Sequence, residues 1–374
     1  MAYNLAAMTV LVRSFAKINL GLRIGAIRSD GFHELLTVYQ TIALHDVIRV
    51  SVNRGRGVEI RCDDRRVPTG ESNTCYRIVE KALQAMKVKG RVVVEIEKRL
   101  PVQGGMGGAS SNAVAALLAL ERAVSKHLPA DERLRIAGEV GSDLPLFLLG
   151  GTVLGVGRGE QVYPLQDIPA MPCVVVTPAV GVSTPNAFAE WDRLLSRKGG
   201  VGMSAGQPGA AVPTQLGALR QSGQAGGRAR PQTRNAKTTD AKLTMENASD
   251  RINELGFALS AWLSESYSGA PFRRGRAENP LLALVRAGIK NDFEQVVFPE
   301  YPELSEGRSA LDGAGAQYVS LSGSGSTLYG LFASKDAARK AVATLRSRGW
   351  AAQATVSLTR REYWRRIFSE RRSG

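Results

Sequence analysis

The stretch Gly104-Gly105-Met106-Gly107-Gly108-Ala109-Ser110-Ser111-Asn112-Ala113 decides the fold of this 374-residue chain. It follows Arg91–Glu97, where apolar and charged residues alternate as in a strand, and it leads into the Ala- and Leu-rich segment 113–120, which predicts a helix. Glycines between a strand and a helix let backbone N–H groups converge on an anion, and the helix N-terminus adds about half a positive charge. We therefore expect a loop that binds a nucleotide phosphate, with Ser110 and Ser111 at the start of the helix.

Three other glycine-rich loops do not match this stretch. A Walker A loop ends in Gly-Lys-Ser/Thr, whereas Gly108 is followed by Ala109 and Ser110. A dinucleotide fingerprint that began at Gly105 would need a glycine in place of Ser110, and a protein kinase would need a later His-Arg-Asp loop, which the chain lacks. A tight turn without a ligand remains the alternative.

The loop with its flanks, Pro101–Ala113, resembles the second motif of the GHMP kinases, the superfamily of galactokinase and of homoserine, mevalonate and phosphomevalonate kinase. Ser14–Leu22 resembles the first motif of that superfamily and Leu321–Thr327 the glycine-rich third, in the same order along the chain. The resemblance implies an α+β, two-lobed fold. Its N-terminal lobe, like ribosomal protein S5 domain 2, would span residues 1–161, and its ferredoxin-like C-terminal lobe would span 162–374.

Four more segments narrow the resemblance to one branch of the superfamily. Asp30–Leu35, Gly141–Phe147, Val182–Pro185 and Asn291–Glu294 are similar to segments of the 4-diphosphocytidyl-2-C-methyl-D-erythritol kinases. That branch phosphorylates the 2-hydroxyl of its substrate with ATP, in the non-mevalonate route to isoprenoid precursors. Two alternatives stay open: another small-molecule GHMP kinase, of the homoserine or mevalonate type, and a non-catalytic nucleotide-binding protein on the same fold.

Two charged residues are candidates for the chemistry. Phosphoryl transfer to an alcohol needs positioning, neutralisation of charge and a group that accepts the hydroxyl proton. Asp143, next to the apolar segment 144–147, is the expected base, and a helix-capping aspartate is the alternative. Lys17, in an apolar strand-like run, is the expected cation, which would lower the pKa of the hydroxyl and keep Asp143 ionised. A solvent-facing lysine on an edge strand is the alternative.

The binding residues follow mainly from the resemblance. Phe32 and Phe188 would stack on the cytosine and His33 would read its edge, while Asn19 lies on the same strand face as Lys17 and would contact the erythritol hydroxyls or Asp143. The full assignment for the substrate is Asn19, Phe32, His33, Thr184 and Phe188. The assignment for ATP is Asn73, Gly104, Gly105, Gly107, Gly108, Ser110 and Ser111, and the third motif is carried by Gly323, Ser324 and Gly325. A Mg²⁺ ion would bridge the β- and γ-phosphoryl oxygens, and its protein ligands are unknown at this stage.

Three positions depart from the pattern of the second motif. Gln103 stands where small residues are usual, Ala109 replaces a glycine and Asn112 replaces an aspartate. Because Gln103 does not match the motif, the sequence does not predict the path of the loop at this position.

The net charge of +15 is unevenly distributed. No acidic residue lies between Asp192 and Asp240, where there are eight Lys and Arg residues, and the tail 360–374 holds six arginines against two glutamates. The rest of the chain is nearly balanced, so the charge does not form a patterned nucleic-acid surface. The insert 196–242 is rich in Gly, Ala, Gln, Ser and Thr and is predicted to be a disordered loop, with a basic arm for RNA or membrane as the alternative.

The cysteines and the apolar segments of the chain indicate the cellular compartment to expect for the protein. Cys62, Cys75 and Cys173 form no metal-ligand spacing or disulfide framework, no run reaches the roughly 18 apolar residues of a membrane span, and no signal peptide is evident. We expect a cytoplasmic monomer or homodimer that acts on a small molecule, with no nucleic-acid or membrane partner. Met8 is an alternative start, since it lies just before the first predicted strand.

Alternating strands and helices are predicted along the chain. The strands are expected at 9–15, 20–27, 47–52, 58–62, 92–97 and 173–177, and the helices at 74–86, 186–195 and 251–264. A βαβ-like run is expected over 318–355, and the second lobe is expected to begin near 162–164.

Overall fold

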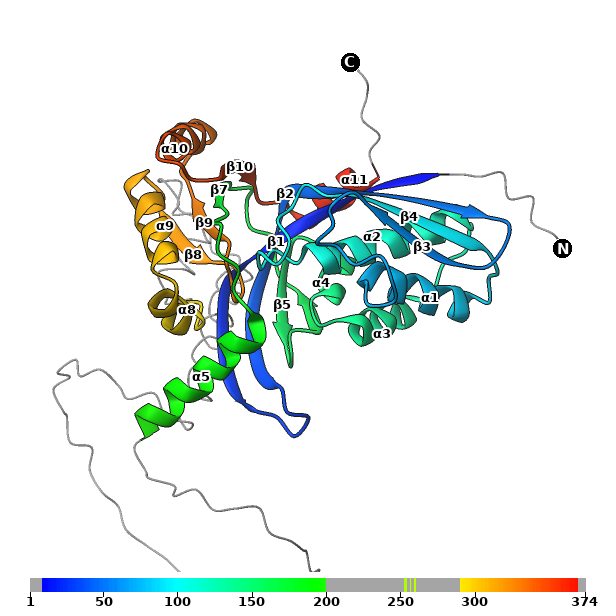
Figure 1. Cartoon of the computed structure of the whole chain (residues 1–374), viewed down its shortest axis with the longest axis horizontal. Helices are drawn as coiled ribbons and strands as arrows, with labels where there is room; N and C mark the ends of the chain where they lie inside the picture. Colours follow the sequence, from blue (N-terminus) through cyan, green and yellow to red (C-terminus); the bar gives the residue numbers. More distant parts are fainter. Residues whose placement is uncertain (1–8, 200–251, 254–255, 257–258, 260–289, 369–374) are drawn as a thin grey trace, which may run out of the picture.

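The computed structural model describes residues 9–199, 252–253, 256, 259 and 290–368. Two sheets organise these residues, one of six strands and one of four, and a long hairpin runs through the middle of the molecule between the two groups of helices (Figure 1). This is the two-lobed α+β architecture expected from the sequence. The predicted disorder of the insert from residue 200 onward and most of the predicted helix 251–264 lie outside the described residues, as do residues 1–8.

The six-stranded sheet is built around two long antiparallel strands, β1 (Val10–Ile27) and β2 (His33–Asn53). The far edge of β2 pairs with β4 (Arg91–Glu97) at one end and with β5 (Thr152–Val156) at the other. β3 (Gly57–Cys62) runs parallel to β4, and β6 (Gln161–Pro164) pairs with β5.

β1 is one continuous strand, whereas the sequence predicted two strands separated at residues 16–19. The register shifts between Phe15 and Ala16 and between Asn19 and Gly21, so bulges bend the strand without ending it. Every residue from Ser14 to Leu22 is buried, because β1 is covered on both faces. The polar residues Lys17 and Asn19 are therefore carried into the interior by a strand whose neighbours are apolar.

Four helices cover one face of the large sheet. They are α1 (Thr74–Met86), α2 (Gly108–Ala123), α3 (Ala130–Val140) and α4 (Leu144–Leu149). α1 has the predicted bounds, and its buried residues Cys75, Ile78, Val79, Ala82 and Met86 follow the helical spacing. α2 begins directly after the glycine loop, at Gly108, so Ser110 and Ser111 do lie in its first turn.

The four-stranded antiparallel sheet has the order β10-β7-β9-β8. Its strands are β7 (Pro172–Val176), β8 (Tyr318–Leu321), β9 (Leu328–Leu331) and β10 (Ala352–Val356). The helices of this lobe are α5 (Thr184–Gly199), α8 (Glu294–Glu300), α9 (Pro302–Gly313) and α10 (Lys335–Ser347). With one helical connection after β7 and another after β9, this order is that of the ferredoxin-like fold, as expected.

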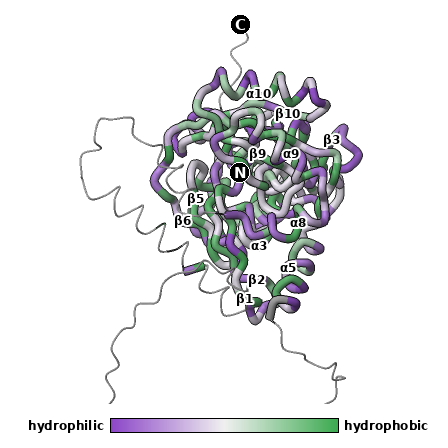
Figure 2. Tube along the Cα trace, turned by 90° about the vertical axis from the view of Figure 1, so that its left-hand side faces the viewer, coloured by the Kyte–Doolittle hydropathy of each residue, from purple (hydrophilic) through white to green (hydrophobic). Residues whose placement is uncertain are grey.

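The predicted helix 186–195 is longer at both ends in the structure, where it forms α5, so residues 196–199, which were predicted to begin the disordered insert, are helical. In Figure 2, hydrophilic and hydrophobic residues alternate along α5 and α10, as amphipathic helices require. The third glycine motif forms the loop between β8 and β9.

The lobes share a buried apolar layer. Ala16, Ile18 and Leu20 of β1 pack with Val175 of β7 and Tyr329 of β9 in one core cluster. The last helix of the described chain is α11 (Arg360–Ile367), which returns to the large sheet and packs beside β1 (Figure 1).

The predicted boundary between residues 161 and 162 falls inside β6, and α11 lies with the first lobe, so the division of the chain into 1–161 and 162–374 stays a prediction. None of the helices in the described ranges combines the length and apolarity that crossing a bilayer requires.

Candidate functional site

Two cavities meet at the glycine loop. The first, which we call the loop cavity, has a volume of about 350 Å³ and lies between the loop, the start of α1 and Lys98. The second, the hairpin cavity, has a volume of about 660 Å³ and lies between the β1–β2 hairpin, α5 and the third glycine motif. Gly105 and Gly107 line both cavities. A group bound on the loop is therefore accessible from either side.

Glycines are required at two positions of the loop. Gly105 and Gly107 have φ values of 73° and 66°, in the left-handed region, and Gly107 is the N-cap of α2. A Cβ at Gly107 would lie 2.9 Å from Cζ of Phe147 and 3.1 Å from Cγ of Lys17. The absence of side chains thus lets the loop lie directly over Lys17. Gln103 also has a positive φ, of 60°, which defines the loop path that the sequence left open.

The third motif packs against the second. Ser322 Oγ donates to the carbonyl oxygen of Gly105 at 3.0 Å, and the backbone N–H of Thr327 donates to the carbonyl oxygen of Gly104 at 3.2 Å. Asn291 Nδ2 donates to the carbonyl oxygens of Leu321 and Gly323, at 2.9 and 2.7 Å. Asn291, which lies before the third motif in the sequence, thus holds the backbone of that motif in place. The sequence alone did not reveal this role.

Lys17, which is buried, and Asp143, which is partly exposed, form an ion pair in the hairpin cavity. Lys17 is 3% exposed, its Nζ lies 3.4 Å from Oδ2 of Asp143, and it donates to Oδ1 of Asn19 at 2.6 Å. The backbone N–H of Lys17 donates to the carbonyl oxygen of Met106 at 3.0 Å, which ties β1 to the glycine loop. The interpretation of Lys17 as a solvent-facing lysine is therefore wrong.

Asp143 stands at the N-cap position of α4, yet its side chain makes no capping hydrogen bond. It is instead directed to Lys17 and to Tyr39, whose hydroxyl donates to Oδ1 of Asp143 at 3.1 Å. Burial first, and the charge of Asp143 second, raise the pKa of the Tyr39 phenol well above 10. Sequence reasoning missed Tyr39, because only the pairing of Tyr39 with Asn19 across the hairpin brings it to this site.

The aromatic residues expected at the cytosine line the hairpin cavity, although their arrangement differs from a simple sandwich. The rings of His33 and Phe188 stack on each other, with centroids 4.9 Å apart and an interplanar angle of 11°. Phe188 also meets Phe293 edge-on, and Nε2 of His33 lies 2.8 Å from Oδ1 of Asp192. Phe32 is 54% exposed. Stacking of Phe32 and Phe188 on one base stays a prediction.

Three polar residues line the hairpin cavity beside these aromatics: Arg158, Thr184 and Ser324. The guanidinium carbon of Arg158 lies 4.9 Å from the centroid of the Phe32 ring. The hydroxyls of Thr184, at the start of α5, and Ser324, in the third motif, are 2.7 Å apart. The structure thus brings Thr184 and Ser324 together, and their roles in binding stay predictions.

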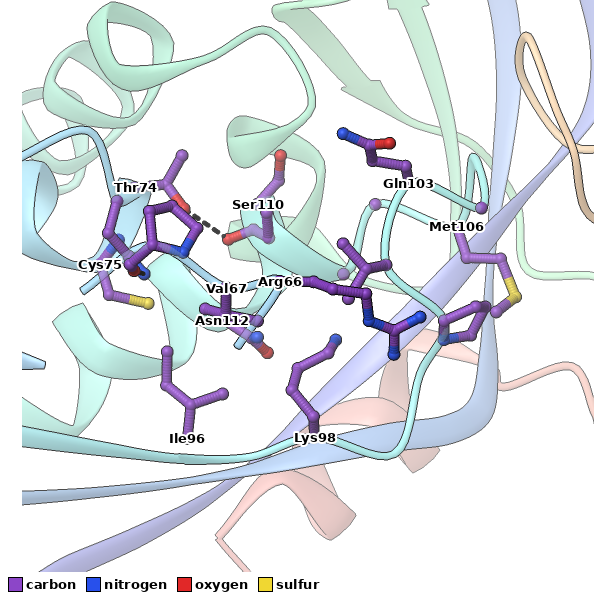
Figure 3. A pocket seen from close by; sticks show the side chains of 18 of the residues that line it. Arg66, Val67, Thr74, Cys75, Ile96, Lys98, Gln103, Met106, Ser110 and Asn112 are labelled. Carbon is purple, nitrogen blue, oxygen red and sulfur yellow. Dashed lines mark hydrogen bonds between the residues drawn. The ribbon is translucent and has the colours of Figure 1, made fainter. Parts of the chain in front are cut away.

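The loop cavity contains two basic side chains that sequence reasoning missed. Arg66 and Lys98 both line it, and Figure 3 shows their side chains beside the loop that carries Gln103 and Met106. Nζ of Lys98 lies 3.5 Å from the position of a Cβ at Gly108 and donates to Oδ2 of the buried Asp46 at 2.6 Å. Neither residue belongs to a glycine motif, so only the fold reveals that they lie near the loop.

The polar residues predicted for ATP differ in how they face this cavity. Ser110 and Asn73 line it, but Asn73 caps α1: its Oδ1 accepts from the N–H of Cys75 and its Nδ2 donates to the carbonyl oxygen of Pro68. The hydroxyl of Ser111 is buried in the core, where it accepts from Ser14 at 2.7 Å. The backbone N–H of Ser111 donates to the carbonyl oxygen of Gly107 at 2.8 Å, and Ser111 does not line the loop cavity, so its assignment to ATP stays a prediction.

Comparison with known proteins places this site in a family. The family model for the GHMP kinases N terminal domain matches residues 73–151, and the model for the GHMP kinases C terminal domain matches 276–350. A 4-diphosphocytidyl-2-C-methyl-D-erythritol kinase of Solibacter usitatus (strain Ellin6076) is 33% identical over 360 residues, which cover 96% of this chain and 93% of the relative. The chain belongs to the 4-diphosphocytidyl-2-C-methyl-D-erythritol kinase family. Another member of the family, from Synechococcus sp. (strain JA-2-3B'a(2-13)), is 33% identical over 91% of this chain and 90% of its own length.

Solved structures agree with this family. A crystal structure of 4-(cytidine 5'-diphospho)-2C-methyl-D-erythritol kinase superposes with a TM-score of 0.61 at 27% identity, covering 94% of this chain and 99% of its own. Homoserine kinase from Cytophaga hutchinsonii ATCC 33406 gives a TM-score of 0.63 at 19% identity, covering 96% and 97% of the two chains. The fold is thus common to several GHMP kinases, and the sequence identity distinguishes the erythritol kinase family among them.

Proposed function

We propose that this protein transfers the γ-phosphoryl group of ATP to the 2-hydroxyl of 4-diphosphocytidyl-2-C-methyl-D-erythritol, at the Lys17–Asp143 pair. The observation that carries the proposal is that Gly105 and Gly107 line both cavities, with Lys17 directly beneath the loop. ATP bound in the loop cavity would present its γ-phosphate at the loop. The alcohol would reach the same point from the hairpin cavity.

Each residue of the pair has a distinct part in this reaction. Asp143 accepts the proton of the 2-hydroxyl as the oxygen attacks phosphorus, and it is free to do so because it does not cap α4. Lys17 stabilises the negative charge that develops on the attacking oxygen, and its ion pair with Asp143 directs the carboxylate to the same point. The backbone N–H groups at the start of α2 bind the phosphate oxygens, since the helix N-terminus favours anions.

A magnesium ion fits the oxygen chemistry of the loop cavity. Among the described residues no group of three or more His, Cys, Asp or Glu side chains forms a metal site. This agrees with the way proteins hold Mg²⁺ in kinases, through substrate phosphates, water and one or two hard oxygen ligands. The hydroxyl of Ser110, which lines the cavity, is the oxygen ligand that we propose. When bound, the ion neutralises charge on the phosphoryl oxygens.

The hairpin cavity supports a cytidyl group as the distal part of the substrate. Phe32, His33 and Phe188 offer aromatic faces, and Arg158 places a cation beside Phe32. A base needs such stacking surfaces, and the diphosphate that links it to the erythritol needs positive charge. Homoserine and mevalonate carry no base that could stack on these aromatic residues, so a kinase of the homoserine or mevalonate type accounts for the cavity less well.

The free thiols support a cytoplasmic location, since none of the three cysteines forms a disulfide. We further infer a monomer or homodimer that has no nucleic-acid partner, as expected from the sequence.

A coupled assay of ADP release tests the proposed function. The purified full-length chain is incubated with ATP, Mg²⁺ and each of four alcohols: the cytidyl substrate, methylerythritol phosphate without the nucleotide, homoserine and mevalonate. We expect efficient turnover of the cytidyl substrate alone, because binding energy from the remote cytidyl group helps to orient the 2-hydroxyl. Efficient turnover of any other alcohol would contradict the substrate assignment. If no ADP were released with any of the four alcohols, the non-catalytic alternative would be favoured.

A further inference from the structure

Tyr39 is in contact with both members of the Lys17–Asp143 pair. Its hydroxyl donates to Oδ1 of Asp143 at 3.1 Å, while Oδ2 of the same carboxylate faces Lys17 at 3.4 Å. The ammonium group of Lys17 also lies 5.6 Å from the centroid of the Tyr39 ring. The two oxygens of Asp143 are thus divided between a neutral donor and a cation.

Two glycines leave the space that the Tyr39 ring fills. A Cβ at Gly155 of β5 would lie 2.5 Å from Cε2 of Tyr39, and a Cβ at Gly159 would approach the Tyr39 hydroxyl more closely than real Cβ atoms approach any atom. Tyr39 itself is 2% exposed. Its hydroxyl is therefore fixed in position by its surroundings, with Asp143 as the acceptor that it reaches.

We propose that Tyr39 is a positioning residue for phosphoryl transfer, whose hydroxyl holds Oδ1 of Asp143 and so keeps Oδ2 directed to Lys17 and the acceptor hydroxyl. The role rests on the proposed function, since it acts through Asp143 as the base. A fixed carboxylate rotamer matters because small errors in the placement of a reacting group are costly in rate.

The Tyr39 hydroxyl remains a donor to Asp143 at every pH of an ordinary assay. Lys17 from β1 faces the same carboxylate. The other charged or titratable groups on the described wall of this cavity are His33 from β2, Arg158 from the turn after β5 and Asp192 from α5, and the charge of Glu160 acts on Tyr39. Burial and the charge of Asp143 raise the pKa of Tyr39 well above 10, so the phenol keeps its proton between pH 5 and 9. Tyr39→Phe therefore removes the donor that holds Oδ1 of Asp143 throughout this range.

The test compares Tyr39→Phe with a matched variant of another buried tyrosine. Tyr363 is 1% exposed, and its hydroxyl donates to the carbonyl oxygen of Phe147 at 2.7 Å. Tyr363→Phe therefore also removes a buried phenol hydrogen bond, but one that does not involve the Asp143 side chain. Both variants keep the ring, so the core stays filled.

The measured quantities are kcat and KM for the cytidyl substrate, with the wild-type enzyme measured first. In Tyr39→Phe we expect kcat to fall about 10-fold with KM nearly unchanged, because the carboxylate loses its fixed position while the substrate pocket is kept. Tyr363→Phe should keep the wild-type kcat and KM. Gly159→Ala, which displaces the hydroxyl without changing Tyr39, should lower kcat as Tyr39→Phe does.

The outcomes separate this role from the proposed function. An active wild type with the same kcat in Tyr39→Phe would overturn the positioning role alone, and so would equal losses of kcat in Tyr39→Phe and Tyr363→Phe. A wild type that does not turn over the cytidyl substrate would overturn the proposed function, and the role of Tyr39 with it.

Discussion

Gly105 lies against the main-chain carbonyl oxygen of Ser322, 217 residues further along the chain, so closely that this oxygen leaves no room for a Cβ at Gly105. The carbonyl oxygen of Gly325 lies 2.9 Å from the same Cβ position. The second and third glycine motifs thus meet backbone to backbone. Because Gly105 lines both cavities, this contact fixes the loop at the point where the loop cavity and the hairpin cavity meet.

We predict that Gly105→Ala disrupts this contact and lowers activity by about 100-fold or more, because the atoms that must move belong to the main chain. Its φ of 73° adds a strain of about 1 kcal/mol for alanine. Gly349→Ala is the matched control, since Gly349 has a φ of 87° but no atom within 4 Å of a Cβ. Turnover and urea unfolding are measured for both, and equal effects in the two variants would contradict the prediction.

Removal of either member of the Lys17–Asp143 ion pair should affect chemistry rather than ATP binding. We expect Asp143→Ala and Lys17→Ala each to lower kcat by about 100-fold or more, since a general base contributes about 10²- to 10⁴-fold. Affinity for ATP, measured by calorimetry, should change little, because both side chains line the hairpin cavity. Arg339→Ala, which removes an exposed ion pair with Asp336 on α10, serves as a control that should keep full activity. Near-wild-type turnover in Lys17→Ala or Asp143→Ala would exclude the mechanism.

The sequence predicted the parts of the site that lie in short, ordered motifs. The residues around the second motif predicted the strand before it, the glycine loop and the helix after it. The spacing of Lys17 and Asn19 predicted that they share one face of a strand, and in the structure Nζ of Lys17 donates to Oδ1 of Asn19 at 2.6 Å. The continuity of β1 was not predictable, because the bulges within it depend on its pairing with β2.

Other residues could not be predicted because tertiary contacts bring them to the site. Tyr39 reaches Asp143 through the register of the hairpin, and Lys98 reaches the loop from the end of β4, outside any motif. The stacking of His33 on Phe188 joins a strand to a helix that lies about 155 residues further along the chain. Such contacts are set by tertiary packing within and between the lobes, and they leave no local pattern in the sequence.

The three cysteines should differ in reactivity toward alkylation. Burial raises the pKa of the Cys75 and Cys173 thiols, so both stay protonated and inaccessible in the native protein at pH 8, whereas Cys62 is only partly buried. We predict that iodoacetamide labels Cys62 first, and that Cys75 and Cys173 react only after denaturation. Peptide mass spectrometry locates the label, and early modification of Cys173 would contradict its burial between the two lobes.

Phe188 should contribute to binding of the cytidyl group. Stacking of a base on an aromatic ring is worth about 1 to 3 kcal/mol, so Phe188→Ala should raise KM for the cytidyl substrate by about 5- to 150-fold. The KM for ATP should barely change. Since Phe188 also packs on Phe293, some loss of stability is expected, and Phe298→Ala is the control, because Phe298 packs against the same core but does not line the cavity. An unchanged KM in Phe188→Ala would place the cytosine elsewhere.

Arg158 should recognise the diphosphate of the substrate. Lys17 and Arg158 are the two Lys or Arg side chains on the described wall of the hairpin cavity, and Lys17 is already engaged by Asn19 and Asp143. We therefore predict that Arg158→Gln raises KM for the cytidyl substrate by about 5- to 20-fold, with little change in kcat, because a charge-assisted hydrogen bond to phosphate is lost. Arg158→Lys should recover part of the affinity, since it keeps the charge but not the paired N–H donors.

Arg61→Gln, which removes an exposed arginine paired with Glu59 on β3, is the control and should leave KM unchanged. If Arg158→Gln and Arg61→Gln gave the same KM, the diphosphate would have to be bound without Arg158.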